Sequence, residues 1–208
     1  HYENNNAKKR WQESHMSTSN LTTMKAGIAP DNLLVSLLSP GSGYFSIIGL
    51  TIKRSLLQKT GLMNENLWVH QDTDFINKIA YKGRLKPGRL DQPVALRRIH
   101  ESNRISSPRT THQVFIDRNK MWVSLCRWFK KHADNEAYQK MLNSVISYSM
   151  NTRHYDTSTN KLIHPEIIRR VRLLSLLFHV PEIILESRFW IKFFPIRVSR
   201  IIFKKLIG

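Results

Sequence analysis

The chain has 208 residues and a formal net charge of +18, from 33 Lys and Arg against 15 Asp and Glu. A hydrophobic content of 41% excludes an intrinsically disordered chain, and a single cysteine, Cys126, excludes an internal disulfide and is typical of a reducing compartment. The charge excess indicates an anionic partner, and a nucleic acid, an acidic membrane face and a nucleotide-diphosphate substrate all qualify.

Turn residues and changes of periodicity divide the first half of the chain into short elements. Helix starts are marked by Pro and Asp, helix ends by Gly, and strands by aromatic and β-branched residues. The predicted elements are a helix over 30–39, a buried strand over 44–54, a helix over 53–60 that ends at Gly61, a helix over 71–82 that ends at Gly83, and an extended run over 93–100.

After Thr111 the pattern becomes helical throughout. Apolar residues recur at helical spacing over 112–132 and 136–150, and amphipathic helices broken by Pro181 and Pro195 follow from Leu162 onward. We therefore predict two parts, an α/β part over 1–110 and an all-α, basic part over 111–208.

Two carboxylates, Asp72 and Asp74, stand at the start of a predicted helix, in the sequence HQDTDF. Helical spacing puts Asp72 on the face of Phe75 and Ile76, toward the interior, and lets Asp74 pair with Lys78 on the outside. An ordinary explanation for Asp72 is a first-turn residue stabilised by the exposed N–H groups and the helix dipole. The functional alternative is a general base.

His100 ends the extended run, in the sequence RRIH. It is one of nine His, and its ordinary interpretation is a residue of a polar loop. The alternative is a ligand of a metal or a phosphate, because neutral imidazole binds divalent ions and neighbouring arginines bind phosphate through two hydrogen bonds.

These segments, in this order, resemble the second half of a family 2 glycosyltransferase, an enzyme of the GT-A fold. The resemblance covers about residues 30–107 and rests on four pieces with compatible spacing: Lys59-Thr60-Gly61, Gln71-Asp72, Pro93-Val94 and Arg98-Ile99-His100. It implies a partial GT-A (nucleotide-diphospho-sugar transferase) fold, α/β in class, for residues 1–110.

The resemblance also implies a chemistry. Asp72 would deprotonate an acceptor hydroxyl, which attacks the anomeric carbon of a nucleotide-diphospho-sugar with inversion. His100 would help to hold a Mn²⁺ or Mg²⁺ ion on the diphosphate, with Arg98 assisting at the phosphates. The other candidates for substrate binding are Gln71, Trp68 and Asp74. The implied enzyme is a metal-dependent glycosyltransferase that uses a saccharide or lipid-linked acceptor in cell-surface polysaccharide or glycolipid synthesis.

The chain departs from the family in its donor half. In the family a nucleotide-binding half with a D-x-D motif comes first, whereas the only D-x-D of this chain is Asp72-Thr73-Asp74, and no alternating strand–helix units precede Asn20. We therefore expect a fragment that is inactive by itself. A different class also stays open, a non-catalytic basic protein that binds membranes or nucleic acid. No zinc finger, RNP-like motif or GXXG loop favours nucleic acid.

The stretch 169–208 combines 9 Lys and Arg and 2 Glu with many large apolar residues. This composition is typical of amphipathic helices in a membrane interface, so we expect contact with an anionic membrane surface. The expected location is the cytoplasm, peripheral on the inner face of the cell membrane. The alternative is that these helices pack on the domain and leave their charges in water. No segment of the stretch is long enough to span a bilayer.

Overall fold

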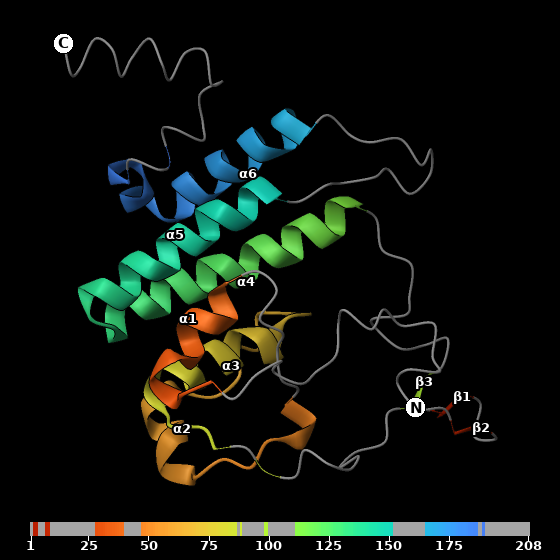
Figure 1. Ribbon diagram of the computed structural model, residues 1–208. Helices are drawn as coiled ribbons and strands as arrows, with labels where there is room; N and C mark the ends of the chain where they lie inside the picture. Colours follow the sequence, from red (N-terminus) through yellow and green to blue (C-terminus); the bar gives the residue numbers. More distant parts are fainter. Residues whose placement is uncertain are drawn as a thin grey trace. The chain divides into compact units, whose positions relative to one another are not determined.

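Figure 1 shows the chain as a computed structural model, which divides into two compact units, His1–Arg109 and Thr110–Gly208. Each unit is described by itself. The described residues are 2–3, 7–8, 28–39, 47–86, 88, 98–99, 111–151, 165–186 and 189. Helices dominate these residues in both units.

Three α-helices lie in the described part of the first unit, each where the sequence predicts one. They are α1 (Leu33–Leu38), entered through the 3₁₀ turn η3 (Pro30–Asn32), α2 (Arg54–Thr60) and α3 (Gln71–Lys82). Helix α3 packs against both α1 and α2, and burial of apolar side chains between the helices stabilises the cluster. The buried apolar residues are Leu33, Leu34, Leu67, Phe75, Ile76, Ile79 and Ala80.

Two glycines end α2 and α3, for different physical reasons. Gly61 has φ 74° and ψ −178°, a combination that is open almost only to glycine. Gly83 follows α3, and a Cβ atom there would lie 2.8 Å from Cδ2 of Leu56 and 3.0 Å from the carbonyl oxygen of Ile79. Both predicted helix ends are confirmed, and the missing side chain of Gly83 lets α2 approach the end of α3.

The expected α/β fold class, a partial GT-A domain, is wrong for the described residues. Where a buried strand was expected over 44–54, the described portion forms a 3₁₀ turn, η4 (Ile47–Gly49), and then leads into α2. Ile48 is 62% exposed, so this run is not a core strand. The physical reason is that β-branched residues favour a strand only when neighbouring strands and a covering layer are present.

Strands occur among the described residues only as pieces of two residues each. They are β1 (Tyr2–Glu3), β2 (Ala7–Lys8) and β3 (Arg98–Ile99), in the spatial order β2-β1-β3. β1 pairs antiparallel with β2 and parallel with β3. The extended conformation expected at the end of 93–100 is therefore present at β3, but these pieces are too short to form the sheet of an α/β domain.

The second unit contains three longer helices that pack against one another. These are α4 (Thr111–His132), α5 (Asn135–Asn151) and α6 (Pro165–His179), with the 3₁₀ segment η5 (Pro181–Leu185) packed against α6. Figure 1 shows α4, α5 and α6 lying beside one another. The helical prediction for the described part of 111–208 is confirmed, including the break at Pro181, whereas Pro195 lies outside the described residues.

The core of the second unit is apolar, and a few polar contacts connect or cap its helices. The side chains that are at most 1% exposed are Leu125, Cys126, Phe129, Met141, Leu142, Val145, Ile146, Leu173, Leu176, Ile183 and Phe189. Buried Asn119 of α4 donates from Nδ2 to Ser175 Oγ of α6 at 2.8 Å. At the turn between α4 and α5, Asp134 Oδ1 accepts the Ala137 N–H at 2.8 Å, as a helix N-cap does.

None of the helices in the described part of the chain combines the length and the apolar character that crossing a bilayer requires.

Candidate functional site

Helix α3 begins at a strained residue. His70, its N-cap, has φ 66° and ψ 17°, and it is the only non-glycine residue with positive φ among the described residues. Such a conformation is uncommon for a residue with a Cβ and persists only where the surrounding structure holds it. Strain of this kind is frequent at functional sites, which makes the start of α3 a candidate site.

The two carboxylates of HQDTDF occupy opposite environments from those predicted. Asp74 is fully buried and Asp72 is exposed, whereas the sequence predicted Asp72 inside and Asp74 outside. The predicted pairing of Asp74 with Lys78 is confirmed, but the pair is buried. The reason is that burial along α3 depends on position along its axis. Every residue over 74–80 is buried, whereas the first turn extends beyond the packed region.

Asp74 therefore has a structural environment. Its carboxylate pairs with the Lys78 ammonium, and their side chains are 0% and 6% exposed. One turn along, Asn77 Nδ2 donates to the carbonyl oxygen of Thr73 at 2.8 Å. A buried charge needs such a partner, because removing it from water is costly. Contact between Asp74 and a substrate stays a prediction, and the buried pairing does not favour it.

Asp72 has the environment that a reacting carboxylate needs. Its Oδ1 accepts the Thr73 N–H at 2.8 Å, which fixes the carboxylate at the helix N-terminus. No described residue forms an ion pair with it, and the side chain is open to solvent. A ligand with a hydroxyl group can therefore approach Asp72 from outside the protein.

Trp68 and Gln71 flank this carboxylate in sequence. The Trp68 side chain is 68% exposed, whereas the neighbouring Leu67 is 3% exposed and anchors the loop in the core. Gln71, the first residue of α3, is half-buried. Near the start of α3 the chain therefore carries an exposed indole, which can stack on a ligand, and four residues later an exposed carboxylate, which can accept a proton.

Two further residues, Arg98 and His100, were predicted to act at the phosphates and the metal ion. Arg98 lies in β3, which pairs with β1. His100 lies outside the described residues. The assignment of phosphate or metal binding to Arg98 and His100 therefore stays a prediction.

The Mn²⁺ or Mg²⁺ ion that the resemblance implies stays a prediction, because its expected ligand His100 lies outside the described residues. Within the described ranges, no group of three or more His, Cys, Asp and Glu could hold a metal ion. Of the carboxylates near the start of α3, Asp74 is already paired with Lys78, which leaves Asp72 without an acidic partner for a shared ion. No chemical step proposed below passes through a metal.

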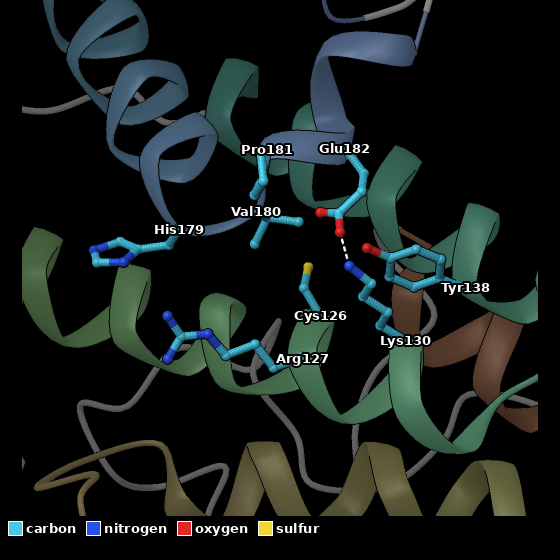
Figure 2. A pocket seen from close by; sticks show the side chains of 8 residues that line it. All are labelled: Cys126, Arg127, Lys130, Tyr138, His179, Val180, Pro181 and Glu182. Atoms are coloured by element: carbon cyan, nitrogen blue, oxygen red, sulfur yellow. Dashed lines mark ion pairs between the residues drawn. The ribbon is translucent and has the colours of Figure 1, made fainter.

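A pocket of about 240 Å³ in the second unit was not predicted from the sequence. Figure 2 shows its side chains, which come from α4, α5, α6 and η5. The lining residues are Cys126, Arg127, Lys130, Tyr138, His179, Val180, Pro181 and Glu182. The sequence did not predict that these residues lie together, because they come from segments that are far apart in the chain. Pro181 was recognised, but only as a helix break.

The pocket combines buried, unreactive side chains with exposed cations at its edge. Burial raises the pKa of the Cys126 thiol to about 12, so it stays protonated and is a poor nucleophile. Burial first, then the charges of Cys126 and Glu186, raises the pKa of Tyr138 to about 12. Lys130 forms an ion pair with Glu182 that joins α4 to η5. The pocket therefore lacks an activated nucleophile.

In comparisons with known proteins, the chain matches no family model, no curated protein and no solved structure.

Proposed function

We propose that the chain takes part in sugar transfer, with the start of α3 on the acceptor side and Asp72 as the general base. The donor would be a nucleotide-diphospho-sugar, and the acceptor a saccharide or a lipid-linked saccharide of cell-surface polysaccharide or glycolipid synthesis. The observation that carries the proposal is the contrast between the two carboxylates. Asp72 is exposed and has no ion-pair partner among the described residues, whereas Asp74 is buried against Lys78.

The proposed step follows from the position of Asp72. The acceptor hydroxyl donates its proton to the Asp72 carboxylate while its oxygen forms a bond to the anomeric carbon. The bond between that carbon and the diphosphate oxygen breaks, the nucleoside diphosphate leaves with the bonding electrons, and the configuration inverts. The exposed Trp68 ring would stack against the apolar face of the acceptor sugar and orient its hydroxyl.

This proposal does not include the GT-A fold, because the described residues are helical. It assigns to the chain the residues that receive the acceptor proton and orient the acceptor. For binding the nucleotide and balancing the charge of the leaving diphosphate, Arg98 and His100 stay the candidates.

The test is sugar transfer by the full-length gene product with a panel of nucleotide-diphospho-sugars and saccharide acceptors. Asp72→Asn removes the proton acceptor and is expected to lower kcat by about 10²–10⁴-fold, with donor binding unchanged. Glu65→Gln is the matched control, because Glu65 is another exposed acid in the segment before α3 and is given no role. Full transfer activity in Asp72→Asn, or no transfer with any pair in the panel, would contradict the proposal.

A further inference from the structure

Helix α6 carries a second apolar face that no described residue covers. Val171, Leu174 and Phe178 are 51%, 50% and 83% exposed. Their spacing of three and four residues places them on one side of the helix, which we call the α6 stripe. Beyond the helix end, Leu185 of η5 is 82% exposed.

The α6 stripe is not the face by which the helix joins the core. Leu173 and Leu176 are fully buried and Arg172 is 2% exposed, so the core-facing side of α6 is already packed. A helix that is apolar on two sides needs a second apolar environment, and large exposed apolar patches mark interaction sites. Among the described residues, Phe178 is the most exposed of the large apolar side chains.

Positive charge lies beside the end of the stripe. Arg127 and His179, both exposed, line the same pocket, and His179 directly follows Phe178 of the stripe in sequence. Figure 2 shows the Arg127 guanidinium and the His179 ring on one side of that pocket, opposite the Lys130–Glu182 ion pair. Glu182 is thus neutralised by Lys130, which leaves Arg127 as an excess cation at this edge.

We infer that the α6 stripe and its cationic edge dock on a lipid bilayer that contains anionic lipids. Phe178, Leu174 and Val171 enter the boundary between headgroups and acyl chains, and Arg127 contacts lipid phosphates. A second copy of the chain fits this surface less well, because pairing two stripes would bring together two cationic edges of chains that each carry +18. The inference does not depend on sugar transfer.

The test is co-sedimentation of the full chain with vesicles of phosphatidylcholine alone and of phosphatidylcholine mixed with phosphatidylserine. The wild-type chain is expected to bind the mixed vesicles more tightly, and to lose affinity as salt is raised. Phe178→Ser is expected to lower the affinity about tenfold, and Arg127→Gln severalfold on the anionic vesicles only. Leu62→Ser is the matched control, because Leu62 is 74% exposed in the first unit and has no place in the stripe.

Two further measurements separate the other possible occupants of the stripe. Light scattering of the wild-type chain reports self-association, and limited proteolysis reports docking of the stripe on another part of the chain. If the wild-type chain forms dimers that Phe178→Ser disperses, and if it does not bind vesicles, the stripe binds a second copy of the chain and the inference is overturned. Equal binding of wild type, Phe178→Ser and Leu62→Ser would also overturn it, as would faster proteolysis of Phe178→Ser with unchanged vesicle binding. Circular dichroism verifies that each variant is folded.

Discussion

Removing one partner of the buried Asp74–Lys78 pair should destabilise α3 strongly. The two side chains are 0% and 6% exposed, so Asp74→Asn removes the carboxylate that pairs with the buried Lys78 charge. Breaking a buried pair in this way costs about 3–5 kcal/mol. The chain offers a matched comparison in Glu136 and Lys140 of α5, which form a pair of the same spacing with side chains that are 78% and 48% exposed. For that pair we expect a contribution of about 0.3–0.5 kcal/mol.

The assay is equilibrium unfolding in urea, with hydrogen exchange of the α3 and α5 amides to report on each unit separately. Asp74→Asn should raise exchange throughout α3, whereas Glu136→Gln should leave α5 nearly unchanged. The double variant Asp74→Leu with Lys78→Met should recover most of the loss, because it removes both charges. The reasoning is refuted if Asp74→Asn destabilises α3 no more than Asp72→Asn does.

Three further predictions concern the stability of the two units. Burial raises the pKa of Cys126 from 9.0 to about 12, so the folded state keeps a proton that the unfolded state loses. The free energy of unfolding should therefore be complete below pH 9 and fall by about 1.4 kcal/mol per pH unit above it. Urea unfolding should find a smaller slope in Cys126→Ala. Gly61→Ala should destabilise the first unit by about 1–3 kcal/mol in thermal unfolding, since φ 74° with ψ −178° strains a residue that has a Cβ, and an unchanged midpoint would contradict this. Phe129→Ala should cost the second unit about 3–5 kcal/mol in urea unfolding, because the ring is fully buried, and a loss below about 1 kcal/mol would show that α4 is packed differently.

Local signals predicted the helices well because those signals act through the backbone of a few neighbouring residues. Gly61 ends a helix because it can adopt a positive φ, and Pro181 because it has no backbone N–H. Sequence alone therefore identifies both positions. The strand over 44–54 failed for the opposite reason. Its β-branched residues have a strand preference that only neighbouring strands can satisfy, and the described structure provides none beside Ile47–Gly49.

The sequence predicted where in the chain the candidate site lies, but not which of its two acids is exposed. The sequence identified Asp72 and Asp74 at the start of a helix, and identified Lys78 as the partner of Asp74. It reversed the burial of the two acids, because helical periodicity gives the angle of a side chain around the axis and not how far packing extends along it. The pocket beside Cys126 gave almost no sequence signal, because it depends on how α4, α5 and η5 pack.

The most direct test of the role of Asp72 is a single-turnover measurement with the full-length gene product. The protein is first saturated with a labelled nucleotide-diphospho-sugar and then mixed with acceptor, so that the rate reports the chemical step. If Asp72 is the base, Asp72→Asn should bind the donor normally and form product about 10²–10⁴-fold more slowly, while Glu65→Gln matches the wild type. Equal rates for Asp72→Asn and the wild type would contradict a catalytic role for the start of α3.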